Sequence, residues 1–210
     1  MISKSLLLSL FLLLRSASAQ NTSLTSSDSM NLKGKLDSLI QLARDYTDKG
    51  EFDIALELNR MAESIAINEF GKESVAYSDV CFNHGRILYL TNNKALFTDA
   101  LRWFMDAMNV IEKLLGKENS KYALCLSNIG KLKSKFGETK EAETLYLSAL
   151  EIWRSATFFD SIEYAKCAGN LAIIFVEKQE FESAEALMVE VKNIFLKLVG
   201  ENNALYGNAV

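Results

Sequence analysis

Residues 122–130 read Tyr-Ala-Leu-Cys-Leu-Ser-Asn-Ile-Gly, and 42 residues later positions 164–172 read Tyr-Ala-Lys-Cys-Ala-Gly-Asn-Leu-Ala. Tyr206 continues the same 42-residue spacing. Alanines extend the pattern towards the N-terminus, at spacings of 45, 42 and 42 residues: Ala55, Ala100, Ala142 and Ala184. Self-similarity at a period of roughly 20–50 residues indicates a repeat architecture. A repeat protein of this kind is expected to provide a binding surface for a partner. The pattern does not identify an active site.

The composition favours helices. The chain of 210 residues is 49% hydrophobic, contains no proline and only 10 glycines, and carries a formal net charge of −4. A chain so poor in helix breakers is expected to be mainly helical. The weak acidity argues against nucleic acid as the main partner, because phosphate binding needs clustered lysine and arginine.

Three cysteines and one histidine leave little room for metal chemistry, so we expect no metal and no cofactor. Cys125 and Cys167 occupy the same repeat position, which places their backbones about 10 Å apart and too far for a disulfide. Together with Cys81, we interpret them as small buried hydrophobic residues, although an odd free thiol is unusual in an exported protein.

The N-terminus resembles an export signal. Lys4 precedes an apolar run at 6–14, and Ala17-Ser18-Ala19 matches a small-x-small cleavage site. We predict a signal peptide at 1–19 and a secreted or periplasmic protein after cleavage near Ala19, with an uncleaved anchor as the alternative. The run is too short to span a membrane. Residues 20–34 are predicted to be a flexible lead-in, which contains a possible glycosylation triplet at Asn21.

Beyond residue 34 the hydrophobic period predicts two helices per unit. The predicted units are 35–71, 72–116, 117–158 and 159–200, and the turn region of the second contains about three extra residues. Small residues share one position of the first helices, where they let the paired helix approach closely: Ala43, Gly85, Gly130 and Ala172. Because no single pair can bury both of its faces, the pairs are expected to stack.

These motifs resemble the tetratricopeptide repeat (TPR). The resemblance is carried four times in phase, by segments such as Gly50-Glu51-Phe52 with Ala55 and Gly137 with Ala142-Glu143. The 42-residue period and the linkers at 116–119 and 200–203 resemble the longer, kinesin-light-chain type, although the His-Pro of that linker is missing and Gln179 stands where glycine is usual. The resemblance implies an all-α, right-handed superhelical α-solenoid of about four stacked helix-turn-helix repeats.

Residues 201–210 resemble the start of a truncated fifth unit. Without a polar cap, the last helix pair would expose an apolar face, and self-association through that end is then expected. An alternative function follows from the family: similar arrays precede effector domains, so the chain could be the N-terminal sensor or interaction array of a larger signalling protein or protease.

Three sets of residues are candidates for a binding site on the inner face, which in this family is lined by the first helices. The resemblance implies that an asparagine row hydrogen-bonds the backbone of an extended peptide: Asn83, Asn128 and Asn170. A second register position carries cations that would attract an acidic peptide: Arg44, Arg86 and Lys131, with Ile173 in the fourth unit. Phe82 and Tyr89 could hold an apolar side chain. Each set also has a structural alternative. The asparagines could bridge helices, the cations could form a solvated charged face, and the two aromatic residues could pack between units.

The only histidine, His84, stands where later units carry Ile129 and Leu171, so we interpret it as a partly buried structural residue. No catalytic partner is evident for it, and no glycine-rich phosphate loop is present. The sequence therefore predicts a non-enzymatic, exported scaffold that binds an extended peptide or protein segment in its groove. It does not predict a nucleic-acid partner or an integral membrane span.

Overall fold

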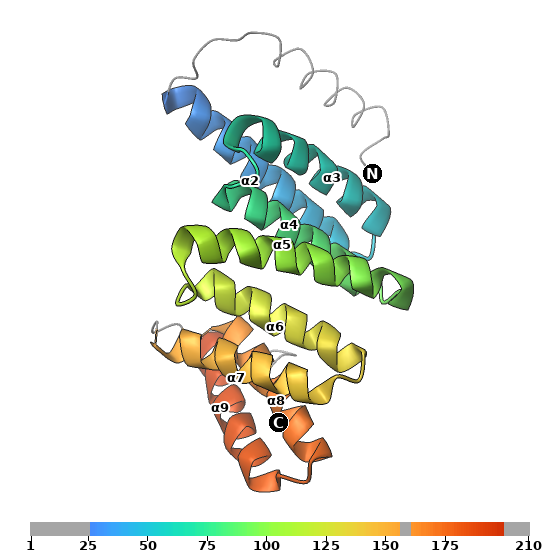
Figure 1. Ribbon diagram of the computed structural model, residues 1–210, viewed down its shortest axis with the longest axis vertical. Coiled ribbons are helices and arrows are strands. Elements are labelled where there is room, and N and C mark those ends of the chain that lie inside the picture. Colours follow the sequence, from blue (N-terminus) through green and yellow to red (C-terminus); the bar gives the residue numbers. More distant parts are fainter. Residues whose placement is uncertain (1–25, 156–160, 200–210) are drawn as a thin grey trace. The chain divides into compact units, whose positions relative to one another are not determined.

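The computed structural model describes residues 26–155 and 161–199, and every regular element in these ranges is helical. Short turns join the helices into four consecutive pairs (Figure 1). The helices are α2 (Ser26–Asp48), α3 (Phe52–Ile65), α4 (Val75–Leu90), α5 (Phe97–Leu115), α6 (Ser120–Lys135), α7 (Thr139–Ser155), α8 (Ile162–Glu177) and α9 (Phe181–Val199). A π-helical turn, η1 (Ala66–Phe70), extends α3, and a 3₁₀ turn, η2 (Lys94–Leu96), precedes α5.

The described residues fall into two compact units: the first contains the beginning of α2, residues 26–35, and the second contains residues 36–155 and 161–199. The repeats lie in the second unit. There α4 packs on α5, α6 on α7 and α8 on α9, while α3 contacts α4, α5 contacts α6 and α7 contacts α8. This nearest-neighbour pattern confirms the all-α solenoid of about four stacked helix pairs.

The predicted flexible lead-in is wrong for residues 26–34. Helix α2 begins at Ser26 and passes through this segment without interruption, although Met30 is 78% exposed. Extending an existing helix costs little, because nucleation is the expensive step and the segment contains no proline. The absence of a hydrophobic period therefore did not mean the absence of a helix. The predicted signal peptide at 1–19, the triplet at Asn21 and the fifth unit at 201–210 lie outside the described residues.

The turns inside the four pairs share one feature of backbone conformation. Each contains one residue with a positive φ, in the left-handed region that favours glycine. These residues are Gly50 at 77°, Asn92 at 53°, Gly137 at 81° and Gln179 at 63°. Gln179 thus adopts the glycine-like conformation that its place in the repeat demands.

The second unit accommodates its extra residues in η2. Its helices are joined by residues 91–96, whereas residues 136–138 suffice in the third unit. Asn93 accepts a hydrogen bond from the backbone N–H of Ala95 and so caps the 3₁₀ turn. This confirms the predicted three-residue insertion and explains the single 45-residue spacing.

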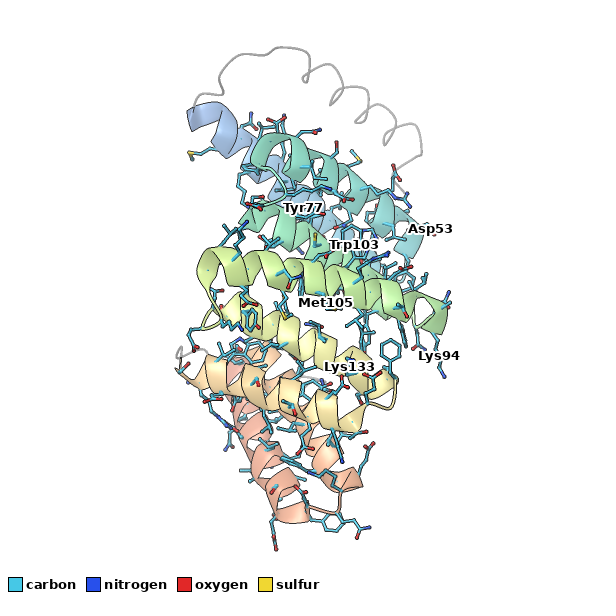
Figure 2. The ribbon with its side chains drawn as sticks, in the orientation of Figure 1. Asp53, Tyr77, Lys94, Trp103, Met105 and Lys133 are labelled. Carbon is cyan, nitrogen blue, oxygen red and sulfur yellow. The ribbon has the colours of Figure 1, made fainter. Side chains whose placement is uncertain are left out.

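The small residues of the first helices face large rings of the second helices. A Cβ atom built on Gly85 would lie 3.0 Å from the ring of Phe104, and one on Gly130 would lie 2.8 Å from Cε1 of Tyr146. Both rings are fully buried or nearly so. The ring of Trp103 stacks on His84, with centroids 4.2 Å apart (Figure 2 labels Trp103 on α5). The predicted close approach of paired helices is confirmed at these two glycines.

Candidate binding groove

A cavity of about 390 Å³ lies between the first helices of the first three pairs. Its lining includes apolar and charged side chains of α2, α4 and α6: Ile40, Arg44, Asp79, Phe82, Lys121 and Leu124. Ala107 and Ile111 of α5 complete its floor. A mainly apolar cavity with a few convergent polar groups has the character of a ligand site.

The asparagine row is not uniformly accessible. Asn83 is fully buried; its Nδ2 donates to Oδ1 of Asn59 at 2.9 Å, and its Oδ1 accepts from Nε of Arg44 at 3.3 Å. Direct contact of Asn83 with a ligand does not fit this burial, because the second unit packs its amide against α3. Helix bridging, the alternative drawn from the sequence, describes Asn83 better.

The other two asparagines lie nearer the surface. Asn128 is 9% exposed; its Nδ2 donates to the carbonyl of Leu124 at 2.8 Å, and its Oδ1 accepts from Nζ of Lys131 at 3.3 Å. Asn170 is half-buried. Gln41 occupies the same register in the first unit, is exposed and donates to Asp45 at 2.9 Å. The sequence analysis did not include Gln41 because the row was defined by asparagine alone. A carboxamide side chain nevertheless occupies this register position in all four units.

The cationic row lies together along the groove. Burial lowers the pKa of Arg44, and the nearby charge of Arg86 lowers it further. Burial likewise lowers the pKa of Lys131. The nearby charge of Glu163 raises this pKa, whereas those of Lys166 and Arg86 lower it further. The structure thus places these cations within electrostatic reach of one another, as expected for residues on one face.

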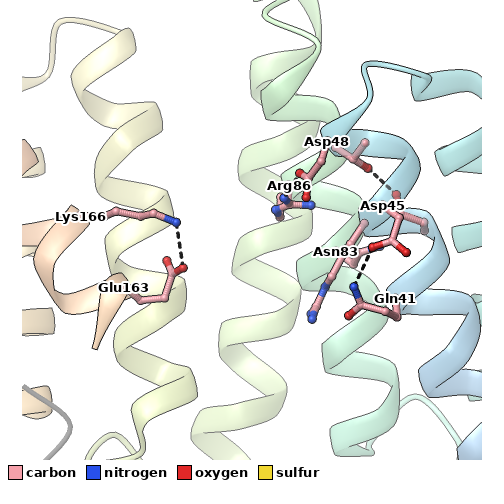
Figure 3. Close-up of polar contacts among 10 residues, drawn as sticks. Gln41, Asp45, Asp48, Asn83, Arg86, Glu163 and Lys166 are labelled. Atoms are coloured by element: carbon pink, nitrogen blue, oxygen red, sulfur yellow. Dashed lines mark hydrogen bonds and ion pairs between the residues drawn. The ribbon is translucent and has the colours of Figure 1, made fainter. Parts of the chain in front are cut away.

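Each cation has a different set of neighbours. Nη2 of Arg86 pairs with Asp48 at 2.5 Å, whereas its Nη1 is buried and has no hydrogen-bond partner among the described residues (Figure 3). Arg44 has no carboxylate within ion-pair distance in the described part of the chain. Ile173, which takes the equivalent position in the fourth unit, is 59% exposed.

Acidic side chains also border the groove, and sequence reasoning did not single them out. Asp79 of α4 pairs with Lys121 of α6 across the cavity. Glu163 pairs with Lys166 at 3.2 Å on α8 (Figure 3). The face is therefore mixed in charge, and these two lysines are partly neutralised.

The two aromatic candidates differ. Phe82 is half-buried, lines the cavity and packs against Phe104 with ring centroids 5.3 Å apart. Tyr89 is half-buried and stacks on Phe97 at 6.0 Å, outside the cavity lining. Phe82 therefore remains a candidate for contact with a ligand, whereas packing between helices accounts for Tyr89.

Comparison with known proteins agrees with this architecture. A family model described as Tetratricopeptide repeat matches residues 94–155, the region from η2 to the end of α7. Residues 94–155 thus match the tetratricopeptide repeat (TPR), and the fold is that of a TPR solenoid. The match covers the second helix of the second pair and the whole third pair, and the remaining described helices are also arranged in pairs.

Solved structures of other TPR proteins show the same fold. BtubC (BKLC) from P. vanneervenii aligns with a TM-score of 0.69 and 17% identity, over 87% of this chain and 74% of that one. Kinesin-light-chain TPR-like repeats from Podosopora anserina align with a TM-score of 0.63 and 17% identity, over 83% of this chain and 81% of theirs. A STAND protein with a TPR sensor, PH0952 from Pyrococcus horikoshii, aligns with a TM-score of 0.62 and 18% identity, over 97% of this chain and 29% of that one. No curated protein matches the sequence.

The three thiols are buried and His84 is half-buried. Burial raises the pKa of Cys81, Cys125 and Cys167 to about 12, and all three are free thiols. Burial lowers the pKa of His84 to about 4, so its imidazole is neutral at physiological pH. Across residues 26–155 and 161–199, no three metal-ligating side chains cluster. None of the helices in these ranges has both the length and the apolar character to cross a membrane.

A second hollow, of about 520 Å³, lies between α5 and α7 above α6. Its lining includes Met105, Lys133 and Leu145; Figure 2 labels Met105 and Lys133. Lys133 is already paired with Glu138 and with Glu141. The charge of Lys133 is therefore balanced by neighbouring carboxylates, and we regard the groove between the first helices as the stronger candidate site.

Proposed function

We propose that this TPR protein is an exported, non-catalytic scaffold that binds an extended, acidic peptide segment in the groove lined by its first helices. TPR folds generally act as protein-interaction scaffolds, and none of the described side chains forms an evident catalytic constellation. The observation that carries the proposal is Arg44 in the lining of a cavity of about 390 Å³, with Arg86 close enough to interact electrostatically with both Arg44 and Lys131.

The cavity and the cations would contribute to binding in different ways. Phe82 and Ile40 offer apolar surface to a ligand side chain, and burial of that surface supplies affinity. Arg44 and Lys131 carry charge in partly desolvated surroundings, where a ligand carboxylate is held more strongly than in water. An acidic segment therefore suits this face better than a basic one.

Binding can be tested with three fluorescein-labelled decapeptides of equal length: one rich in glutamate, its glutamine counterpart and its lysine counterpart. We expect the glutamate peptide to bind tightest and to weaken as salt rises, because added ions screen the charges. Replacement of Arg44 and Lys131 together by alanine should reduce affinity at least about tenfold. Equal binding of the three peptides, or an unchanged affinity of the double variant, would contradict the proposal.

Arg60→Ala provides a control for the loss of a positive charge outside the groove. Arg60 lies on the second helix α3, is exposed and pairs with Glu57 at 2.9 Å, so its removal also eliminates a positive charge. If charge on the groove face matters, Arg60→Ala binds the glutamate peptide like the parent chain. A general electrostatic effect would instead weaken both variants.

Export is the second part of the proposal, and its support is the sequence of residues 1–19 alone. Expression of the full chain followed by fractionation and N-terminal sequencing tests it. The expected product is an exported chain that begins at Gln20. Retention of Met1 with the cell-associated fraction would refute cleavage near Ala19.

A second candidate function is that of a sensor array within a larger signalling protein or protease. The STAND protein from Pyrococcus horikoshii favours it, because 97% of this chain aligns with only 29% of that one, which has a TPR sensor. Sequencing of the transcript beyond the codon for Val210 distinguishes the two. An in-frame effector domain supports the sensor, and a stop codon supports the free scaffold.

A further inference from the structure

Asn59 of α3 breaks the pattern of its register position. The equivalent residues of the later units are large and apolar or aromatic: Phe104, Tyr146 and Met188. Asn59 has no exposed surface. A buried amide is costly unless it is hydrogen-bonded, so packing alone would favour an apolar residue here, as in the other three units.

Both the nitrogen and the oxygen of the Asn59 amide have hydrogen-bond partners. Its Nδ2 lies 3.3 Å from the carbonyl oxygen of Val80 and 3.3 Å from Nδ1 of His84. Its Oδ1 accepts from Nδ2 of Asn83 at 2.9 Å. A carbonyl oxygen can only accept, so Val80 fixes Nδ2 as the end of the Asn59 amide that faces Val80 and His84, and Nδ1 of the neutral His84 accepts from it in the tautomer protonated at Nε2.

The fixed orientation of Asn59 determines that of Asn83. Since Nδ2 of Asn83 points to Asn59, its Oδ1 points the other way, towards the groove, and accepts from Nε of Arg44 at 3.3 Å. Asn83 is fully buried, so water does not offer it an alternative partner. A chain of hydrogen bonds thus leads from α3 through the core to a cation of the groove.

Arg44 is engaged by Asn83 through Nε, the nitrogen nearest its aliphatic chain. Arg44 lines the cavity. A guanidinium held at Nε presents its two terminal nitrogens as a planar fork, the geometry that suits a carboxylate.

We propose that Asn59 is a positioning residue, which holds the amide of Asn83 so that Arg44 is preorganised to bind a ligand carboxylate in the groove. The identity of the ligand rests on the proposed function, whereas the positioning of Arg44 by Asn59 and Asn83 does not depend on it. Preorganisation matters because an arginine that is already ordered loses less side-chain entropy when it binds. The fully buried amide in place of an apolar residue is then explained by recognition rather than by packing.

The positioning can be measured without a ligand or a variant. In the folded full chain, nitrogen-15 NMR should show that the Nε proton of Arg44 exchanges with solvent at least about tenfold more slowly than that of exposed Arg60, because a hydrogen bond protects it. Equal exchange rates of the two arginines would overturn the proposal.

The role in binding is tested with Asn59→Leu, which supplies the kind of residue that the other units carry. With the glutamate decapeptide as probe, we expect about tenfold weaker binding and loss of the Arg44 Nε protection. Met188→Leu, at the same register position in the fourth unit, is the control and should leave both unchanged. An unaltered affinity and exchange rate in Asn59→Leu would overturn the proposal.

A double-mutant cycle separates positioning from a general structural effect. Arg44→Lys keeps the charge but removes Nε, so Asn59→Leu should weaken binding by less than about twofold when it is added to Arg44→Lys. A persistent tenfold loss in the double variant would show that Asn59 acts otherwise and would overturn the inference. If the parent chain does not bind the peptide at all, the proposed ligand fails, whereas the exchange measurement still decides the positioning.

Discussion

Gly130 of α6 lies directly against the ring of Tyr146 of α7, where an added Cβ atom would be 2.8 Å from Cε1. Tyr146 is 2% exposed, so its ring has little freedom to move aside. We predict that Gly130→Ala lowers the free energy of unfolding by about 1–2 kcal/mol, because overpacking outweighs the gain in helix propensity. Thermal unfolding would show this as a decrease of about 2–8 °C in the midpoint.

Gly169 provides the control for that substitution. It also lies inside a helix, α8, but a Cβ atom built on it meets nothing within 4 Å. Gly169→Ala should therefore stabilise the chain by about 0.5–1 kcal/mol, the usual gain when alanine replaces a helical glycine. If both variants shift the midpoint in the same direction, close packing at Gly130 is not what distinguishes them.

The turn residue Gln179 offers a test of backbone strain. Its φ of 63° lies in the left-handed region, where Gly137 stands 42 residues earlier with a φ of 81°. We predict that Gln179→Gly stabilises the last pair by about 0.5–1 kcal/mol, because relief of steric strain exceeds the added entropy of the unfolded chain.

The reverse exchange should have the opposite sign. Gly137→Gln introduces a side chain at a φ of 81° in the third unit, and we expect destabilisation by about 1 kcal/mol. Chemical denaturation of the two single variants compares them directly. A stabilising Gly137→Gln would show that φ does not govern these turns.

His84 predicts a dependence of stability on pH. Burial lowers its pKa from about 6.5 to about 4 in the folded chain. Between these values the unfolded chain binds a proton that the folded chain does not bind, so stability falls as the pH falls from 6.5 to 4, by up to about 1.4 kcal/mol per pH unit. From about pH 7.5 upward both states are almost entirely neutral at this residue and the effect disappears.

His84→Leu isolates this contribution, since Leu171 occupies the same register in the fourth unit. Carboxylates also titrate in this range, and they do so in both chains. The difference in unfolding midpoint between parent and variant should therefore change between pH 6.5 and 4 and stay constant above about pH 7.5. A constant difference throughout would mean that His84 titrates alike in the folded and unfolded chains.

The repeat register made the helix pairs and the small residues at Gly85 and Gly130 predictable, because both depend on period and residue size. It also located Gln179 at a glycine position. The burial of Asn83 was not predictable in this way, since the register shows which face a residue shares but not how deeply a neighbouring pair covers it. Asn59 was missed for a related reason: its role appears only through contacts with α4, 24 and 25 residues away along the chain.

The three thiols give a last test, of the packing between neighbouring pairs. Cys81, Cys125 and Cys167 are at most 2% exposed, and burial raises the pKa of each to about 12. Because the thiolate is the reactive form, we predict that at pH 8 they react with a chromogenic disulfide reagent at least about 1000-fold more slowly in the folded chain than in denaturant. Denaturant should release three equivalents per chain, which is the total cysteine content. Rapid reaction of one thiol in the folded chain would reveal local opening of its pair, and separate cysteine-to-serine variants would identify which pair opens.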